Sequence, residues 1–449
     1  MAKRHSARAG TLQAIFIRLE ELVLANSGED EFEEIFKLIV AKLWDEMNEA
    51  TARFNALGSP EEIAARISLL LSGAASTWPG ILEAGTESRL TPSHLKICVE
   101  ALAPYSLHGA GFEVMDAFFE FLVSRGSKGN KGQYFTPRYV IEFCVRMMQP
   151  SMNELVVDPA CGSGGFLVHT LDYVRRENMP SNKKLQNYCN DFLWGFDVDA
   201  RAIRVAKALM ILAGDGRSNI VHLNSLLKPV AQTALFDTSQ TDGKNSRSIT
   251  IEDVCRTRRR AHKGFDVVLT NPPFAGEVRE ESVLSSYDLG RSKVRVERDV
   301  LFIERCLDLL RPGGRMAIVL PHNKLSATST GDLRRWLLTK AQILAVVGLG
   351  RHTFLPHTHQ KAGVLFLRRL AKGEKPVSDY KIFFGVSDKD GKNSRGELSF
   401  KDDEQIADEN HLSIWDRVDH DLTEIESAFH KFCNQEKVIL GDSNGRMDN

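Results

Sequence analysis

The chain has 449 residues, 43% of them hydrophobic and 26% charged, with a mean hydropathy of −0.23. These values are ordinary for a globular protein and exclude a collagen, a disordered chain, a coiled-coil rod and a small disulfide scaffold. No run of 18 apolar residues occurs, so we expect no transmembrane helix. Basic and acidic residues nearly balance, 58 against 59, so any DNA-binding surface must be local.

The seven cysteines are odd in number and include no CxxC pair. We therefore expect free thiols in a reducing cytoplasm rather than a disulfide framework or a zinc site. His352, His357 and His359 lie close together, but no carboxylate or thiolate is spaced with them as in a metal site, so we expect loop histidines and no metal. Small size explains Cys161 better than a role as a nucleophile.

Apolar residues recur at helical spacing in the first part of the chain, for example Phe32, Ile35, Phe36 and Ile39. This pattern predicts an all-α N-terminal domain over residues 1–128. A glycine-rich, basic stretch at 124–132 follows and is typical of a loop at a domain boundary.

Beyond this stretch, short apolar runs alternate with helical stripes, which predicts a doubly wound, mostly parallel sheet over residues 129–385. The last part, 386–449, is predicted to be a polar tail region with one amphipathic helix that could dock a partner. A polar insert at about 229–264 contains a basic run at 256–263, which is either a solvated segment or a phosphate contact. The predicted strands are Leu155–Val157, Leu193–Phe196, Ile220–Leu223, Phe265–Leu269, Arg315–Leu320, Ile343–Val347 and Gly363–Leu367.

Three motifs follow predicted strands. The first strand ends in Asp158 and continues into the small-residue loop Pro-Ala-Cys-Gly-Ser-Gly-Gly, then a helix. Glycines let the backbone approach a ligand closely, and a helix N-terminus offers free N–H groups. The second strand ends in Asp197, whose carboxylate can accept both hydroxyls of a ribose; Asp199 beyond it can equally be a helix N-cap.

The third motif, Asp266-Val-Val-Leu-Thr-Asn-Pro-Pro-Phe274, likewise puts Asn-Pro-Pro-Phe directly after an apolar strand. Two prolines fix φ and make a rigid corner. That corner can aim the amide oxygen of Asn271 and the carbonyl of Pro272 at one amino group. Phe274 supplies a flat face on which a base can stack.

Together, Asp-Pro-Ala-Cys-Gly-Ser-Gly-Gly and Asn-Pro-Pro-Phe resemble the motifs of N6-adenine DNA methyltransferases. Gly132-Gln-Tyr-Phe-Thr-Pro-Arg138, lying N-terminal to the Gly-rich loop, is similar to the γ arrangement of that family. The resemblance is to the modification (M) subunit of type I restriction-modification systems and covers roughly residues 10–370. It implies an α/β fold, with a Rossmann-like S-adenosylmethionine-dependent methyltransferase domain preceded by the all-α N-terminal domain.

The resemblance also implies roles for individual residues. The target adenine would lie against the Asn-Pro-Pro-Phe motif. The cofactor, S-adenosyl-L-methionine, would lie against the segment before the Gly-rich loop, the loop itself and the ends of the next two strands. Relatives often have Asp where this chain has Asn224, near the cofactor adenine, and many have Glu in place of Asp197. The catalytic residues implied are Asn271, Pro272, Pro273 and Phe274; the cofactor-binding residues are Gln133, Tyr134, Phe135, Thr136, Pro137, Arg138, Asp158, Ala160, Gly162, Ser163, Gly164, Gly165, Asp197 and Asn224.

From these motifs we expect a site-specific methyltransferase that moves a methyl group to N6 of a flipped adenine, without a metal or a covalent intermediate. No segment is typical of a target-recognition domain or an ATPase P-loop. Double-stranded DNA, a specificity (S) subunit and a restriction (R) subunit are therefore the expected partners, with no membrane. The alternatives are a stand-alone adenine methyltransferase, a non-catalytic structural subunit, and a glutamine methyltransferase, whose related motif usually ends in Tyr.

Overall fold

The computed structural model describes residues 5–6, 9–21, 27–48, 53–110, 112–126, 135–214, 219–229, 249–256, 261–401, 414–438 and 440. Much of the predicted boundary loop, half of the basic run at 256–263 and the last nine residues lie outside these ranges. The chain forms two compact units, Met1–Asn130 with Ala200–Gly214, and Lys131–Asp199 with Asp215–Asn449. Within the described ranges, no helix is long and apolar enough to cross a membrane.

The first unit is helical, as predicted. Residues close to the start of α4 fix where this helix begins. The Ser59 hydroxyl accepts from the backbone N–H of Glu62, and the Glu62 carboxylate accepts from the N–H of Ser59. This reciprocal pair is a capping box, and Pro60 follows in the first turn. Phe36 and Phe119 are fully buried in its core. The helices are α1 (Ala9–Leu19), α3 (Glu31–Asn48), α4 (Pro60–Thr77), α5 (Pro92–Leu102), α6 (Phe112–Gly126) and α10 (Ala200–Leu212), with a short parallel pair β1 (His5–Ser6) and β2 (Tyr105–Ser106).

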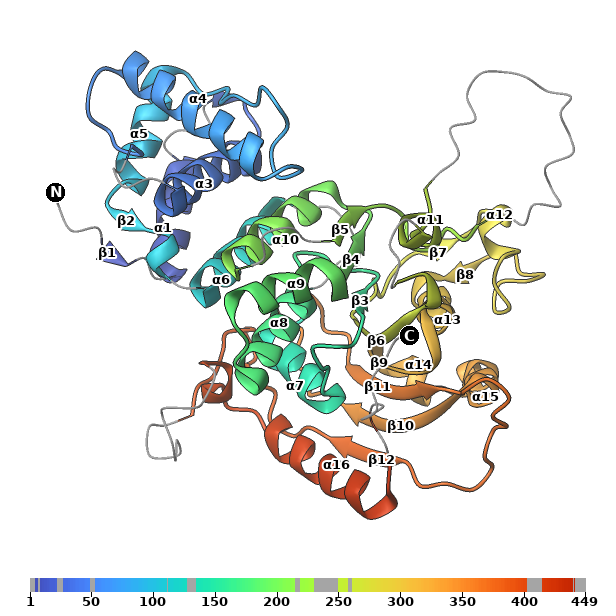
Figure 1. The fold of residues 1–449 in the computed structure, drawn as a ribbon. Coiled ribbons are helices and arrows are strands. Elements are labelled where there is room, and N and C mark those ends of the chain that lie inside the picture. The colour runs from blue at the N-terminus through green and yellow to red at the C-terminus, as the bar shows by residue number, and fades with distance from the viewer. Residues whose placement is uncertain are drawn as a thin grey trace, which may run out of the picture. The chain divides into compact units, whose positions relative to one another are not determined.

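The second unit is built on an eight-stranded sheet in the order β12-β10-β11-β9-β6-β3-β4-β5 (Figure 1). Seven strands run parallel, and β11 is antiparallel to both of its neighbours. The strands are β3 (Val156–Asp158), β4 (Leu193–Asp197), β5 (Asn219–His222), β6 (Phe265–Thr270), β9 (Leu310–Pro321), β10 (Ala341–Gly348), β11 (Ala362–Arg369) and β12 (Phe383–Val386).

The strand order reverses between β3 and β6. From β3 the chain moves through β4 to β5 on one side, then returns to β6 and moves through β9 on the other. In an open α/β sheet, ligands bind at the carboxyl ends of the strands at such a switch point. The Gly-rich loop follows β3 and the Asn-Pro-Pro-Phe motif follows β6, so both motifs leave the sheet at this point.

Helices cover the sheet in the second unit. α7 and α8 pack together and contact β3, β6 and β9, while α13 contacts β6 and β9. Because the β3-to-β4 and β6-to-β9 crossovers run in opposite directions, the right-handed rule puts their helices on opposite faces. The helices are α7 (Arg138–Met148), α8 (Gly165–Asn178), α9 (Asn182–Phe192), α11 (Ile251–Arg256), α12 (Glu281–Leu284), α13 (Arg298–Leu309), α14 (His322–Ser326), α15 (Gly331–Lys340) and α16 (Leu422–Glu436), with a hairpin of β7 (Glu277–Val278) and β8 (Val296–Glu297).

The part of the chain after residue 372 extends the same sheet. β12 adds a parallel edge strand to β10, and α16 packs on α7 and β12. Phe429 of α16 is fully buried, with its ring centroid 5.6 Å from that of Phe383. The apolar side of the helix predicted for partner docking is therefore occupied within its own unit.

All seven predicted strands are present, with some boundaries moved. The run predicted at Arg315–Leu320 is the second half of β9, which begins at Leu310. The polar insert is not wholly irregular, because α11 lies within it and Glu252 pairs with Arg305 of α13 at 2.5 Å. The seven cysteines are all buried free thiols.

Candidate active site

The Gly-rich loop connects β3 to α8. Gly162 and Gly164 have φ values of 51° and 86°, a left-handed conformation that side chains other than glycine rarely adopt. Gly164 is the N-cap of α8 and no side chain caps this helix. Among the described residues, apart from its two chain neighbours, no heavy atom lies within 4 Å of the position that a Cβ on Gly162 would occupy. The loop therefore leaves open space at Gly162 next to the N-terminus of α8, where backbone N–H groups have no partners within the helix, and this suits a ligand that accepts hydrogen bonds.

Asp197 at the end of β4 holds this loop. One carboxylate oxygen accepts from the N–H of Gly162 at 2.9 Å, and the other accepts from the N–H of Asp199 at 2.9 Å. The N–H of Cys161 donates to the carbonyl of Phe196 at 3.0 Å. Burial raises the pKa of the Asp197 carboxyl. A carboxylate has about four acceptor positions, and the backbone N–H groups of Gly162, Val198 and Asp199 that face it leave room for a further donor such as a hydroxyl.

Asp158 at the end of β3 lies deeper, with 1% of its surface exposed. Its Oδ1 accepts from the backbone N–H of Ala160 at 3.0 Å and from the Thr270 hydroxyl at 2.6 Å. Burial, with a smaller contribution from the charge of Asp197, raises the pKa of the Asp158 carboxyl to about 7, although the two hydrogen bonds act to lower it. Asp158 thus links the Gly-rich loop to the residue directly before Asn271.

The Asn-Pro-Pro-Phe motif leaves the end of β6. Asn271 is half-buried, and Phe274 is 8% exposed. The Phe274 ring meets the ring of Phe354 edge-on, with centroids 5.7 Å apart. Phe354 follows β10, some 80 residues later in the chain, so the aromatic wall of this site comes from two separate loops.

The segment before α7 lies against the Gly-rich loop. Thr136, Pro137 and Arg138 are buried and Phe135 is half-buried. A Cβ at Gly165 would collide with the guanidinium of Arg138, so a larger residue here would force that side chain to move. Gln133 and Tyr134 lie outside the described residues.

Asn224 lies in the loop after β5 and is exposed. Its side-chain oxygen accepts from the N–H of Leu226 at 3.0 Å, while the N–H of Leu223 donates to the carbonyl of Asp197 at 2.9 Å. The Asn224 side chain therefore stabilises the turn that follows β5, next to Asp197. The loops after β3, β4, β5 and β6 all meet at one edge of the sheet.

The histidines after β10 differ from expectation in one respect. A carboxylate does approach them, because Asp390 lies 2.7 Å from Nδ1 of His352, 38 residues away in the chain. His357 instead lies beside Phe135, with ring centroids 6.2 Å apart. In the part of the chain that the structure describes, no group of three or more His, Cys, Asp or Glu side chains could hold a metal ion.

Sequence reasoning gave Thr270 no role, although this residue lies within the third motif, and it did not foresee Phe354 at this site. Thr270 is the last residue of β6 and directly precedes Asn271. Phe354 carries no local signal at all, because only the sheet topology brings it to Phe274.

The sheet order, the switch point and the Gly-rich loop define the Rossmann-like fold of S-adenosylmethionine-dependent methyltransferases. Residues 112–448 match the model of the N-6 DNA Methylase family, so the chain belongs to that family. The fold is shared with the methyltransferase subunit of the type I restriction-modification system from Streptococcus thermophilus, at 17% identity with a TM-score of 0.56, covering 94% of this chain and 92% of that one.

Curated relatives include methylase subunits of type I restriction enzymes. The EcoEI methylase subunit of Escherichia coli is 27% identical over 256 residues, which are 57% of this chain and 46% of the relative. The EcoKI methylase subunit of Escherichia coli K12 is 27% identical over 274 residues, 58% of this chain and 45% of the relative. The matched region thus spans about half the length of these relatives.

Proposed function

We propose that this chain transfers a methyl group from S-adenosyl-L-methionine to N6 of a flipped adenine in DNA, as the modification subunit of a type I restriction-modification complex. One observation carries the proposal: Asn271-Pro-Pro-Phe274 leaves the sheet beside the Gly-rich loop, and the 2.6 Å Thr270–Asp158 hydrogen bond joins the two. A base-holding motif and a cofactor-holding loop are thereby fixed against one another.

The residues present fit the cofactor. The open space at Gly162 and the uncapped start of α8 suit a ligand held through backbone N–H groups, and Asp197 has acceptor capacity for ribose hydroxyls. Thr136 to Arg138 border the same loop and form the methionine side of the proposed site. When bound, the cofactor supplies an activated sulfonium methyl group, so the protein needs neither a metal nor a nucleophile of its own.

The chain's own task is to prepare the amine. The lone pair of adenine N6 is delocalised into the ring, so the nitrogen is a poor nucleophile. The amide oxygen of Asn271 and the carbonyl of Pro272 accept hydrogen bonds from the two N–H groups and favour a more tetrahedral nitrogen, which frees the lone pair. The hydrogen bonds to these two oxygens strengthen as positive charge develops on N6, so they stabilise the transition state more than the bound substrate.

The base must leave the duplex, because N6 within a base pair cannot reach the methyl group. Phe274 provides a stacking face for the extruded adenine, and Phe354 supports that ring edge-on. The half-burial of Asn271 fits a group that meets substrate at the mouth of a site.

The proposed partners are double-stranded DNA, an S subunit that selects the sequence and an R subunit that cleaves. We also propose that residues 1–128 form the helical domain, 129–385 the catalytic domain and 386–449 a C-terminal region. The insert run 256–263 stays a candidate phosphate contact. A stand-alone methyltransferase that reads DNA itself is the second candidate.

The test is transfer of a labelled methyl group with DNA or protein as the acceptor, with and without the product of the neighbouring gene. We expect methylated DNA, with N6-methyladenine at one sequence only when the second subunit is present. Sequence-specific methylation by the lone chain would favour the stand-alone enzyme. Label in protein glutamine, or in neither acceptor, would contradict the proposal.

A further inference from the structure

The segment that follows the Asn-Pro-Pro-Phe motif, residues 276–298, returns to its own starting point. β7 and β8 pair antiparallel, and the N–H of Arg298 donates to the carbonyl of Gly276 at 3.0 Å. The hairpin thus begins two residues after Phe274, and its far end at Arg298 is held against this starting point. At about 3.3 Å per residue, its outer turn stays close to the proposed base pocket.

An apolar cluster anchors the hairpin. Tyr287 is fully buried, and Leu284 and Val296 join it in a core with Leu301 and Phe302 of α13. This cluster also includes Leu226, from the loop after β5, and packs against Ala160 of the Gly-rich loop. The hairpin is therefore built onto the two loops that border the proposed cofactor site.

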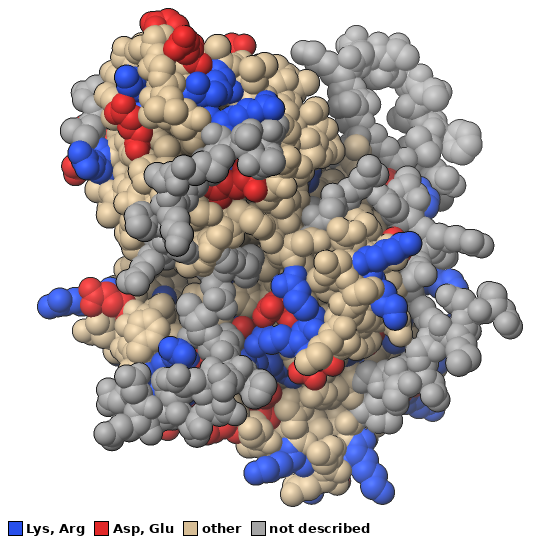
Figure 2. All heavy atoms as spheres, turned by 60° about the vertical axis from the view of Figure 1, so that its left-hand side comes forward, with Lys and Arg blue, Asp and Glu red and all other residues tan. Residues whose placement is uncertain are grey.

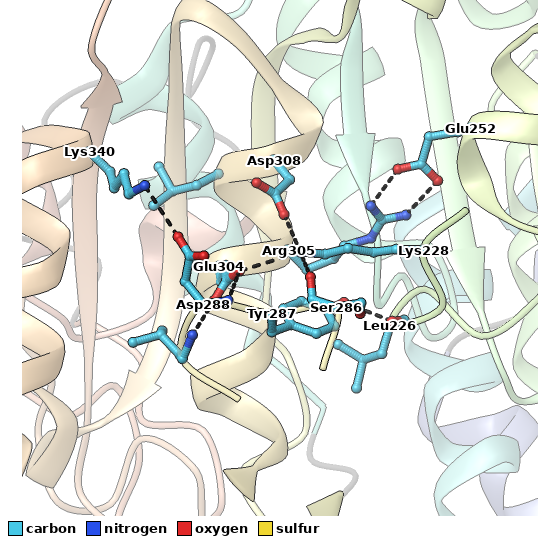
Figure 3. Close-up of polar contacts among 12 residues, drawn as sticks. Leu226, Lys228, Glu252, Ser286, Tyr287, Asp288, Glu304, Arg305, Asp308 and Lys340 are labelled. Atoms are coloured by element: carbon cyan, nitrogen blue, oxygen red, sulfur yellow. Dashed lines mark hydrogen bonds and ion pairs between the residues drawn. The ribbon is translucent and has the colours of Figure 1, made fainter. Parts of the chain in front are cut away.

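A polar network fixes the same region (Figure 3). The Tyr287 hydroxyl donates to the carbonyl of Leu226 at 2.8 Å, and Lys228 donates to the carbonyl of Ser286 at 3.0 Å. The carboxylate of Glu304 accepts from the backbone N–H groups of Asp288 and Leu289 at 2.7 and 2.8 Å. Such contacts hold the backbone of the hairpin in place rather than leaving it as a loose surface loop.

The outer turn has a defined shape. The N–H groups of Arg291 and Lys293 donate to the carbonyls of Tyr287 and Gly290 at 2.9 and 3.0 Å. Ser292 has φ +64°, a left-handed conformation that a serine adopts at a cost and that persists where neighbours enforce it. A Cβ at Gly290 would lie 2.5 Å from the carbonyl oxygen of Leu284, so the turn is tight.

This rigid turn presents Arg291, Lys293, Val294 and Arg295 to solvent. Val294 is 86% exposed. Arg291 and Arg295 pair with Asp288 and Glu277 at 3.7 and 3.3 Å, but exposed ion pairs of this kind are weak and exchange readily for a phosphate. A single exposed valine is normal on a protein surface and does not by itself indicate a binding site. Val294, however, lies between cations on a well-ordered turn close to the proposed catalytic motif.

We infer that this outer turn is a DNA-contacting prong, with Arg291, Lys293 and Arg295 on phosphates and Val294 inserted at the base step from which the adenine is extruded. The inference rests on the proposed function, because a methyltransferase that acts on an extruded adenine needs a surface that contacts DNA beside the base pocket. An apolar side chain inserted between two base pairs unstacks them, while neighbouring cations bind the phosphates. Extrusion of a base from a fully paired duplex costs unstacking and unpairing energy, which such an insertion offsets. On the face drawn in Figure 2, basic side chains form small groups beside acidic ones, as expected where any DNA contact is local.

The first experiment measures binding of the full chain to random-sequence duplex DNA over a range of salt concentrations. Lys293→Ala and Arg295→Ala should each lower the slope of log affinity against log salt by about 1, with weaker binding at every salt concentration. Lys375→Ala, in the exposed loop after β11, is the matched control and should leave the slope unchanged. Equal slopes for the wild type and both prong variants would overturn the inference, and so would binding only to an acidic protein.

The second experiment places 2-aminopurine at the adenine that the methylating complex modifies. Val294→Ala should keep the salt slope but reduce the fluorescence rise on extrusion by about 5-fold or more, and Val294→Leu should retain it. Val377→Ala, another exposed valine, is the control. Normal extrusion by Val294→Ala would overturn the role of Val294. Absence of methylation by the wild type would instead contradict the proposed function, and the salt slopes would still report on the prong.

Discussion

The hydroxyl of Thr270 donates to the buried carboxyl of Asp158 at 2.6 Å, although 112 residues separate the two in the chain. Each is the last residue of its strand, and the strands β3 and β6 are neighbours at the point where the sheet order reverses. Because Asn271 follows Thr270 directly, this hydrogen bond fixes the Asn-Pro-Pro-Phe motif relative to the Gly-rich loop. We therefore propose Thr270 as a positioning residue for the proposed catalytic motif.

Replacement of Thr270 tests this relationship. Thr270→Val removes the donor while keeping the shape, so we expect single-turnover methyl transfer to fall on the order of 10-fold while cofactor affinity changes little. Thr270→Ser keeps a hydroxyl and should restore most of the rate. Equal losses in cofactor affinity and rate for both variants would indicate only a packing role.

The pKa of Asp158 predicts a pH dependence of stability. Burial raises this pKa to about 7, so the folded protein binds the proton more tightly than the unfolded chain. Stability is therefore lost as the pH rises from about 4 to about 7, by up to about 4 kcal/mol. Asp158→Asn should abolish that loss in cofactor-free protein, as measured by urea unfolding at each pH. Parallel curves for both proteins would contradict it.

Glu142→Gln provides the control with the opposite sign. Burial of Glu142 alone would raise its pKa, but His169, Arg146 and Arg176 outweigh it and lower the pKa to about 2. The stability that Glu142 contributes is present above its ordinary pKa and lost as the pH falls toward 2. The advantage of wild type over Glu142→Gln should therefore shrink only in acid.

Asp197 is predicted to hold the cofactor ribose. Asp197→Ala should weaken S-adenosylmethionine binding to the isolated chain by ~1–3 kcal/mol, the cost of losing a charged hydrogen-bond partner. Its loss also frees the N–H of Gly162, so circular dichroism must first show that the fold is intact. Calorimetry with unchanged affinity in a folded variant would remove Asp197 from the site.

Phe274 should affect capture of the base rather than the chemical step. Phe274→Ala removes a stacking face worth ~1–3 kcal/mol per base, so DNA with a flipped or mismatched adenine should bind more weakly. Phe274→Tyr should keep most activity. Because Phe354 packs on the same ring, Phe354→Leu should produce a smaller loss in the same direction. An unchanged KM for DNA in Phe274→Ala would contradict the stacking role.

Much of this fold is predictable because strands buried on both faces of a parallel sheet are continuous apolar runs. Val267 to Leu269 are entirely buried, and so are Met316 to Leu320. The direction of a strand leaves no such trace, so antiparallel β11 was not foreseen. β12 was missed because only its alternate residues face α16, while Phe384 is 71% exposed.

The motif residues of the site are local in sequence and therefore visible in it. Phe354, Thr270 and the contact of His352 with Asp390 depend on pairings across the fold, which no spacing along the chain encodes. The hairpin at 276–298 was missed for a different reason. Its sequence is polar and nearly balanced in charge, and its order comes from buried Tyr287 and from Glu304 of another helix.

The most direct test of the adenine-N6 mechanism is single-turnover methyl transfer by Asn271→Ala with saturating S-adenosylmethionine and DNA, in the complex that methylates. Loss of one of two acceptors should slow the reaction on the order of 100-fold or more, by analogy with a single oxyanion-hole donor, while cofactor binding is kept. The wild-type product should be N6-methyladenine. Transfer by Asn271→Ala at the wild-type rate, or methylcytosine as the product, would contradict the mechanism.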